Sequence, residues 1–352
     1  MNPKPPQRPT AAPTDADKTP DALLTAILGA LKDAGAPLSG EALAQRLGLS
    51  RAAVWKRIHR LRALGYAIEG SPRRGYRLLG LPDKLLPAEI LQGLKSHFLR
   101  GPIHHFETLP STNDLAKELG SREAPEGTLV VAESQTKGRG RLGRAWESPP
   151  GLGLYVSLLL RPPLPPTEMP QITLAAAVAV VRALRRTTGV VPGIKWPNDL
   201  LVDGKKVGGI LTEMETESDC IRHLVVGLGL NVNNPDFPPP LNLIATSLAR
   251  VAGSSFSRRL ILQAWLEEFE DLYRLFLNRD FGVILDEWRE YNVTLGGMVT
   301  VRQGPREITG LALEVAEDGA LLLGQASGEV IRVTSGEIAP GPETGPRAID
   351  PD

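Results

Sequence analysis

A loop rich in glycine and arginine is the first feature of the sequence whose residues could do chemistry. Residues 137–144 read Lys-Gly-Arg-Gly-Arg-Leu-Gly-Arg, with four cations and no acid. Like charges this close repel one another unless an anion lies between them, and glycine lets the backbone approach such an anion closely. We expect a loop that is mobile when empty and is ordered by a ligand that carries phosphate. The alternative is a solvated basic loop that binds nothing.

The loop also contains the spacing Gly-x-Gly-x-x-Gly, at Gly138, Gly140 and Gly143. In dinucleotide-binding proteins this spacing follows a strand and opens a helix. Here Trp146 and the prolines 149–150 come next, and another strand follows them. No helix begins there, so we reject the dinucleotide interpretation.

Lys195-Trp-Pro-Asn-Asp199 and the hairpin after it form a second polar group. Asp203-Gly204 favours a two-residue turn, after which Lys205 and Lys206 begin the returning strand. Side chains alternate along a strand, so only one of the two lysines can face a ligand. We expect it to be Lys206, because a glycine on its face leaves room there; the alternative is that both are surface charges. Strict alternation puts Lys206 with Gly208 and Ile210, and Lys205 with Val207 and Gly209.

Two further polar segments are weak evidence for a ligand site when each is taken alone. Ser111-Thr-Asn-Asp114 stands at the head of an amphipathic helix and is typical of an N-cap, and residues 227–233 end a strand with glycines and asparagines. The patterns GxxxxGK[ST], GxSxG and HExxH are absent, which excludes the usual P-loop, serine-hydrolase and zinc-protease sites. One cysteine, Cys220, and five scattered histidines argue against disulfides and a zinc site. We assign no metal-ligating residue.

A basic unit precedes these segments. Residues 1–80 carry thirteen Lys+Arg and six Asp+Glu, a net charge of +7, so residues 81–352 of the neutral chain carry −7. Helices are expected over 21–33, from Ser39 to Gly48 and from Ser50 to Gly65, followed by a hairpin over 66–78. This order is typical of a winged helix-turn-helix, whose third helix and wing meet DNA; the alternative is a solvated basic face. The cations expected at DNA are Arg51, Lys56, Arg57, Arg60, Arg73 and Arg74.

The segments after this unit predict an α+β domain. Consecutive strands joined by short turns favour a largely antiparallel sheet. The last unit has short strands between glycine-containing turns, which indicates a small β-barrel. The expected strands are 128–132, 154–160, 200–202, 205–212 and 223–231, and the expected helices are 114–119, 171–186 and 258–278.

The boundaries expected from these patterns divide the chain into three units and two tails. The tails, at 1–20 and 341–352, contain almost no large apolar side chains and are expected to be disordered. The longest apolar stretch, 172–181, is too short to cross a bilayer, and the N-terminus lacks a signal-peptide pattern, so we expect a cytoplasmic protein. The three units are the winged helix-turn-helix at 21–80, a ligand-binding domain at 81–295 and the small C-terminal domain at 296–340.

Taken in order, these segments resemble the biotin protein ligases over about residues 106–248. The segments are Ser111-Thr-Asn, Gln135, Gly138-Arg-Gly-Arg141, Lys195-Trp-Pro-Asn-Asp199, Lys206-Val-Gly-Gly-Ile210 and Gly229-Leu-Asn231. The helix-turn-helix in front is similar to that of the bifunctional bacterial form, which also represses the biotin operon. The resemblance implies an α+β ligase domain followed by an SH3-like β-barrel. It implies ATP and Mg²⁺ as cofactors, biotinyl-5′-AMP as the intermediate, and a carboxyl-carrier lysine as acceptor, the activity of a biotin–[acetyl-CoA-carboxylase] ligase.

The resemblance also implies roles for individual residues. Biotin would contact Ser111, Thr112, Asn113, Gln135, Arg139, Gly140, Arg141 and Lys206, of which Arg141 and Lys206 would be catalytic. ATP and the adenylate would contact Arg144, Trp146, Lys195, Asn198, Asp199 and Asn231. Leu142 stands where some family members have another arginine. Operator DNA and a ligand-dependent second copy of the chain are implied as partners.

Three alternatives stay open at this point. A lipoate or octanoate ligase shares the fold of the central domain. A DNA-binding regulator that only senses biotin would keep residues 111–113 but could lack the ATP side, against which Lys195, Asn198 and the arginines of the loop argue. A ligase whose helix-turn-helix has no regulatory role is the third.

Overall fold

The computed structural model describes residues 22–71, 74–97, 99, 101–217 and 219–339. They form two compact units, one ending at Asp83 and the other beginning at Lys84, and each is described by itself. Both expected tails, and Arg73 of the hairpin tip, lie outside the described residues.

The first unit consists of three helices and a hairpin, as predicted. Ser39 and Ser50 cap the second and third helices by accepting bonds from backbone N–H groups, and Gly48 ends the second with a left-handed φ of 64°, a conformation that glycine adopts without strain. The third helix turns Val54, Ile58 and Leu61 into the core. The elements are α1 (Ala22–Asp33), α2 (Gly40–Leu47), α3 (Arg51–Ala63), β1 (Ala67–Ser71) and β2 (Gly75–Gly80).

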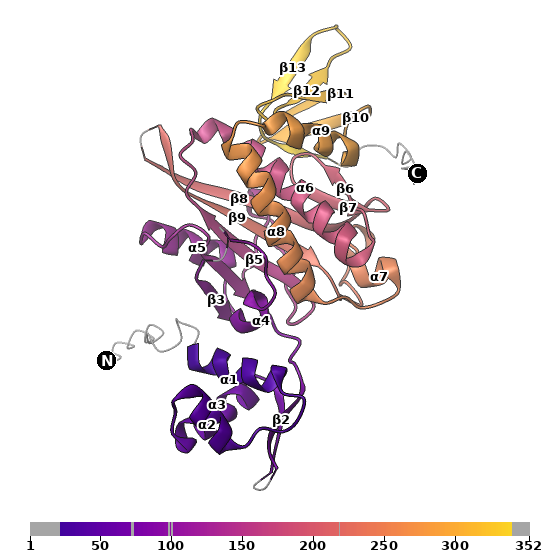
Figure 1. Cartoon of the computed structure of the whole chain (residues 1–352). Coiled ribbons are helices and arrows are strands. Elements are labelled where there is room, and N and C mark those ends of the chain that lie inside the picture. Colours follow the sequence, from indigo (N-terminus) through magenta and orange to yellow (C-terminus); the bar gives the residue numbers. More distant parts are fainter. Residues whose placement is uncertain (1–21, 72–73, 98, 100, 218, 340–352) are drawn as a thin grey trace, which may run out of the picture. The chain divides into compact units, whose positions relative to one another are not determined.

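A seven-stranded sheet forms the centre of the second unit (Figure 1). Its order is β3-β4-β5-β9-β8-β7-β6, and only the pair β3–β4 is parallel, which confirms the expected antiparallel character. The strands β3 and β6 were not predicted from the sequence. The bounds are β3 (Ile103–Phe106), β4 (Leu129–Ala132), β5 (Gly153–Leu160), β6 (Gly193–Lys195), β7 (Asp199–Val202), β8 (Lys205–Glu217) and β9 (Cys220–Asn231).

Helices cover both faces of this sheet. The long helices α6 (Met169–Thr188) and α8 (Arg258–Leu277) lie side by side on one face (Figure 1), and strand residues such as Val131 and Leu158 join them in the main core. Helix α5 (Thr112–Ser121) packs on the other face, where Ala116 meets Val130 and Val225. The alternation of apolar side chains along β4 therefore separates two cores. Three further helices are α4 (Pro87–Leu91), α7 (Leu248–Ala252) and α9 (Phe281–Tyr291).

The C-terminal strands form a separate antiparallel sheet. Its order is β13-β12-β11-β10-β14, and within the described part of the chain β13 and β14 are not paired to close it into a barrel. In the same part of the chain, no helix is both long and apolar enough to span a membrane. The bounds are β10 (Met298–Gln303), β11 (Arg306–Val315), β12 (Leu321–Gly324), β13 (Val330–Val333) and β14 (Glu337–Ile338).

Candidate active site

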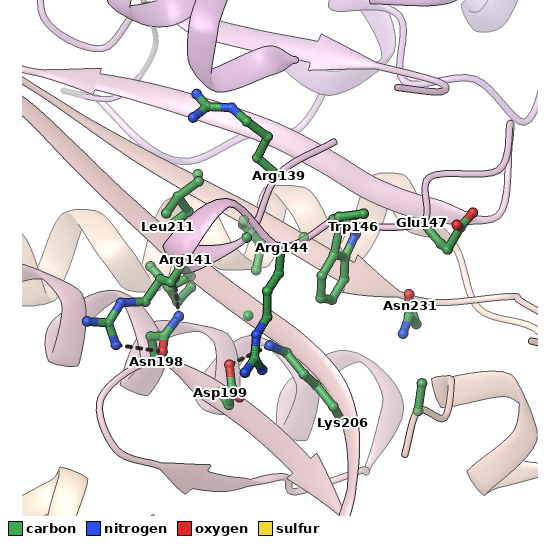
Figure 2. Close-up of a pocket in the computed structure, with 18 of the residues that line it drawn as sticks. Arg139, Arg141, Arg144, Trp146, Glu147, Asn198, Asp199, Lys206, Leu211 and Asn231 are labelled. Atoms are coloured by element: carbon green, nitrogen blue, oxygen red, sulfur yellow. Dashed lines mark hydrogen bonds and ion pairs between the residues drawn. The ribbon is translucent and has the colours of Figure 1, made fainter. Parts of the chain in front are cut away.

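A cavity of about 210 Å³ lies where the head of α5, the arginine loop, the strands β7–β9 and strand β14 meet. We call residues 137–144 the arginine loop throughout. Apolar walls are contributed by residues such as Val156, Leu211 and Leu228, and cations by the loop and the neighbouring strands (Figure 2). The lining includes every residue that the sequence assigned to biotin or ATP, namely Ser111, Thr112, Asn113, Gln135, Arg139, Gly140, Arg141, Arg144, Trp146, Lys195, Asn198, Asp199, Lys206 and Asn231.

The head of α5 brings hydroxyl and amide groups to the cavity. Ser111 is the N-cap and accepts a bond from Asp114 N. Gln135 Oε1 accepts from Thr112 N at 2.9 Å, and Gln135 Nε2 donates to Ser148 Oγ at 3.0 Å. Ser157 Oγ is fully buried and lies 2.8 Å from Thr112 Oγ1. These groups form a fixed hydrogen-bonding surface for the polar end of a ligand.

Asn113 is held by contacts on every side. Its Nδ2 donates to Leu211 O at 3.1 Å and to Glu213 Oε2 at 2.9 Å, and its Oδ1 lies 2.6 Å from Ser157 Oγ. A Cβ atom at Gly227 would lie only 2.1 Å from Asn113 Oδ1. Any side chain at position 227 would therefore displace Asn113, which explains why β9 needs a glycine there.

Ion pairs with distant elements hold the arginine loop. Arg139 pairs with Asp114 of α5, Arg144 pairs with Glu337 of β14, and Arg141 Nη1 donates to Gly336 O at 2.9 Å. Gly140 N also donates to Arg144 O at 2.7 Å across the base of the loop. The sequence-based premise of uncompensated cations is therefore wrong for Arg139 and Arg144, because their acids come from elements far away in the chain.

Lys206 faces the cavity, but not by the predicted alternation. The register between β7 and β8 shifts at Leu200/Leu201, so Leu200 pairs with Gly208 while Leu201 pairs with Lys206. One extra residue on β8 puts Lys206 on the face opposite to Gly208, with which strict alternation had grouped it. Lys206 consequently shares its face with Gly209, where an added Cβ atom would lie 3.2 Å from Lys206 Cε. At the predicted neighbour Gly208, an added Cβ atom would instead meet Leu200 and Leu230.

Lys206 and Trp146 lie together beside two glycines. Lys206 Nζ is 2.5 Å from Asp199 Oδ1 and 5.4 Å from the centre of the Trp146 ring, where a cation is attracted to the ring face. A Cβ atom at Gly229 would lie 2.7 Å from the same ring. Trp146 Nε1 is buried and has no hydrogen-bond partner among the described residues, so a ligand with an acceptor could satisfy it.

The remaining polar residues of the cavity come from the segment before β7 and from the end of β9. Asn198 is fixed by donating Nδ2 to Ile210 O at 2.6 Å, and its Oδ1 faces Arg141 at 3.5 Å (Figure 2). Asn231 Nδ2 donates to Thr246 O at 3.1 Å, and Lys195 Nζ donates to Ile338 O at 3.1 Å. Burial lowers the pKa values of Arg141 and Lys195. Both side chains therefore gain from an anion that offsets their lost hydration.

The cations predicted to contact DNA lie on the first unit. Arg51, Lys56 and Arg60 are exposed on α3, Arg74 is exposed at the hairpin, and Arg57 is half-buried and donates to Ala53 O. The sequence analysis did not select Trp55, which is 56% exposed and lies 4.1 Å from the His59 ring on the same helix. The i, i+4 spacing of the two aromatic residues could have found this pair.

Glu213 and the strand β14 are further features that the sequence analysis missed. Glu213 contacts both Asn113 and Arg139, and Glu337 pairs with Arg144. Glu213 follows Lys206-Val-Gly-Gly-Ile210 by three residues, so alternation from Gly209 would have placed it on the face of the cavity. No local pattern marks Glu337, because its contact depends on how the C-terminal strands pack.

The fold and the site define a class of protein: an α+β domain whose cavity is lined by polar and cationic side chains, preceded in the chain by a helix-turn-helix unit. The model of the biotin/lipoate A/B protein ligase family matches residues 105–231. The model of an HTH domain matches residues 24–77, and that of the biotin protein ligase C-terminal domain matches residues 294–339.

Individual relatives support the same class over most of the chain. The bifunctional ligase/repressor BirA of Bacillus subtilis (strain 168) is 44% identical over 288 residues, which are 81% of this chain and 89% of that protein. The bifunctional ligase/repressor BirA of Escherichia coli (strain K12) is 30% identical over 82% of this chain and 88% of its own. The biotin protein ligase from Aquifex aeolicus, solved in complex with biotin and ATP, has a TM-score of 0.58 at 32% identity and covers 67% of this chain and 97% of its own. The chain belongs to the biotin/lipoate A/B protein ligase family.

Proposed function

We propose that this chain is a biotin–[carboxyl-carrier protein] ligase that is also a biotin-dependent transcriptional repressor. As a ligase it activates biotin with ATP to biotinyl-5′-AMP and transfers biotin to a lysine of the biotin carboxyl carrier protein. The observation that carries the proposal is the single cavity in which the amides and hydroxyls of the α5 head face the cations Arg141, Lys195 and Lys206. Such a cavity suits a ligand with an apolar body, a polar ring and an anionic end.

The chemistry joins two anions, and the cations of the cavity make this possible. An oxygen of the biotin carboxylate attacks the α-phosphorus of ATP, a new P–O bond forms, and pyrophosphate leaves. The lysine amine of the acceptor then attacks the acyl carbon, AMP leaves, and the amine loses a proton. Preorganised cations offset the repulsion during approach and the charge that develops on the phosphoryl oxygens. A closed arginine loop keeps water from the mixed anhydride.

The roles that we propose for the site residues are those implied by the resemblance to the biotin protein ligases, and the residues share one cavity. Thr112, Asn113 and Gln135 take the ring system of biotin, with Ser111 at the helix head. Lys206 takes the carboxylate and the α-phosphate, and Arg139, Gly140 and Arg141 close over both. Trp146 packs on the adenylate. The ATP side consists of Arg144, Lys195, Asn198, Asp199 and Asn231.

Mg²⁺ would arrive with ATP rather than occupy a site of its own. It prefers oxygen ligands and keeps several waters while the phosphates hold it. Among the described residues there is no group of three or more His, Cys, Asp or Glu side chains that could hold a metal. Asp199 lines the cavity and offers an oxygen to such an ion, although it pairs with Lys206 in this structure.

The helix-turn-helix supports the repressor role. Its cations suit the DNA backbone and major groove, and the contacts we propose are Arg51, Lys56, Arg57, Arg60, Arg73 and Arg74. A ligand-dependent homodimer would present two such units to a two-fold operator. Because ATP, operator DNA and the carrier protein are its partners, we place the protein in the cytoplasm.

We retain the unit boundaries predicted from the sequence, at 21–80, 81–295 and 296–340, and an SH3-like barrel for the last of them. The first boundary is close to Asp83, where the compact units divide. The five antiparallel strands β10–β14 supply the elements of such a barrel.

The test is incubation of the full chain with biotin, ATP, Mg²⁺ and a carboxyl-carrier domain, followed by intact mass of the acceptor. We expect the mass of one biotinyl group to be added. Parallel incubations with lipoate and octanoate test the nearest other function of the fold, and modification by one of those acids but not by biotin would overturn the proposal.

A further inference from the structure

Glu213 of β8 contacts both the ligand pocket and the arginine loop with one carboxylate. Its Oε2 accepts from Asn113 Nδ2 at 2.9 Å and lies 3.4 Å from Arg139 Nη2. Its Oε1 accepts from Lys117 Nζ at 2.7 Å. The carboxylate thus joins a residue at the polar end of the cavity to the first arginine of the loop.

The Asn113 end of this contact is rigid. Asn113 is 4% exposed, and its Oδ1 occupies the space that the absence of a side chain at Gly227 leaves. Leu211 O and Glu213 Oε2 share its amide hydrogens. Loss of the carboxylate would leave a buried donor with one acceptor fewer, which is unfavourable.

The Arg139 end controls the base of the loop. The backbone of Arg139 forms an isolated antiparallel bridge with Ala145, so the position of Arg139 is tied to the residue that directly follows the loop. Asp114 is the second acid on the Arg139 guanidinium, and it also lies 3.6 Å from Lys117 Nζ. Two carboxylates and two cations therefore form one alternating cluster between α5, β8 and the loop.

The charge of Glu213 is stable under ordinary conditions. Burial raises the pKa of its carboxyl group, but hydrogen bonds from Lys117 and Asn113 and the charges of Lys117 and Arg139 outweigh burial and hold the pKa below its usual value. The carboxylate is therefore ionised at neutral pH, and a charged acceptor makes stronger hydrogen bonds than a neutral one.

We propose that Glu213 is a positioning residue of the ligation reaction, which couples the polar end of the biotin pocket to closure of the arginine loop by holding Asn113 and Arg139 in one arrangement. The inference rests on the proposed function and adds a residue to it. It implies that two acids hold Arg139: Glu213, which also contacts Asn113, and Asp114, whose side chain is 50% exposed.

Two substitutions distinguish the contact of Glu213 with Asn113 from its contact with Arg139. Glu213→Gln keeps an oxygen for Asn113 but removes the charge that attracts Arg139, whereas Glu213→Ala removes both. In the full-length protein, we expect the Gln variant to bind biotin alone within about threefold of wild type and to release preformed biotinyl-adenylate about tenfold faster, a difference of ~1.4 kcal/mol. The Ala variant should be weakened in both measurements.

Glu215→Gln is the matched control. Glu215 lies two residues further along the same strand, and it pairs with Arg222 and accepts from Ser121 rather than from the loop or Asn113. Its adenylate release should equal that of wild type. The proposal is wrong if Glu213→Gln also releases adenylate at the wild-type rate, or if the Glu215 variant releases it equally fast.

Asp114→Asn is a second variant that tests whether the acids on Arg139 control adenylate release, and it can be used if the Glu213 variants fail to fold. It removes the other acid from Arg139 and leaves Asn113 untouched, so it should speed adenylate release without changing biotin binding. With the Glu213→Gln variant it forms a double-mutant cycle, in which we expect non-additive effects because both acids act on one guanidinium. Additive effects would overturn the proposal.

Failure of wild type to biotinylate the acceptor would instead disprove the proposed function, so the two failures are distinguishable.

Discussion

At the scale of single residues, the two adjacent lysines of β8 differ in what surrounds them. Lys206 lies over the Trp146 ring and beside Asp199, whereas Lys205 is exposed at the hairpin. We expect Lys206→Ala to lower the rate of adenylate formation at least about tenfold, equivalent to ~1.4 kcal/mol of activation free energy. Lys205→Ala should have the wild-type rate. Pyrophosphate release measured with each variant provides the comparison, and equal losses would refute the orientation of the strand.

Glu133 predicts a pH dependence of stability. Burial raises the pKa of this side chain, but the hydrogen bond from His105, the charge of Arg258 and the hydrogen bond from Leu85 N outweigh it and lower the pKa from 4.5 to about 2. Because the folded-state pKa is depressed, the contribution of Glu133 to the free energy of unfolding is fully present above about pH 4.5 and is lost as the pH falls toward 2.

The Glu133→Gln variant tests this pH dependence. It should be less stable than wild type at pH 7 by a few kcal/mol, as expected for a buried pair that loses one partner, and the difference should shrink as the pH falls from 4.5. Urea unfolding of both proteins at several pH values measures it. If the difference in the free energy of unfolding stays constant down to pH 2.5, the lowered pKa of Glu133 is contradicted.

At the scale of elements, the arginine loop is held by charges on three other elements, yet its Leu142 is 71% exposed. Exposed ion pairs are weak, so we still expect proteolysis within residues 137–144 without ligand and protection by biotin plus ATP. Arg141→Gly should release adenylate faster, so that lysines of unrelated proteins become labelled. Equal protection with and without ligand would disprove ordering of the loop.

The elements also show how far the sequence could predict this site. Helix ends such as those at Ser39 and Ser50 depend on local capping bonds and were predicted within a few residues. The gathering of the motifs at one cavity was expected from the resemblance to the biotin protein ligases and not from any single local pattern. The shift at Leu200/Leu201 was not predictable, because a bulge depends on the partner strand. Glu337 was missed for a similar reason, since it meets the arginine loop only in three dimensions, whereas alternation along β8 marks the face on which Glu213 lies.

At the scale of the whole molecule, we expect DNA binding and ligand binding to be coupled. One basic unit makes few phosphate contacts, whereas two units at a fixed spacing bind a two-fold operator far more tightly. If adenylate promotes dimerisation, the protein should bind its operator more tightly with biotin and ATP present, and linkage requires operator DNA to strengthen dimerisation by the same factor. The unbiotinylated carrier protein should compete with dimerisation.

Analytical ultracentrifugation with and without biotin and ATP measures the dimer, and operator binding is measured under the same conditions. We expect the fraction of dimer and the operator affinity to increase together when biotin and ATP are added. Operator affinity that is unchanged by ligand would mean that the helix-turn-helix does not respond to biotin, and the ligase activity would stand alone.

The contribution of strand β14 to the cavity has a consequence for the newly made protein. Glu337 pairs with Arg144, and the backbone oxygens of Gly336 and Ile338 accept from Arg141 and Lys195. During translation the helix-turn-helix leaves the ribosome first, and the cavity cannot be completed until residue 338 has emerged. A nascent chain that has folded its DNA-binding unit therefore cannot yet enclose adenylate, and a chain that ends before β14 would carry the DNA-binding unit without a complete active site.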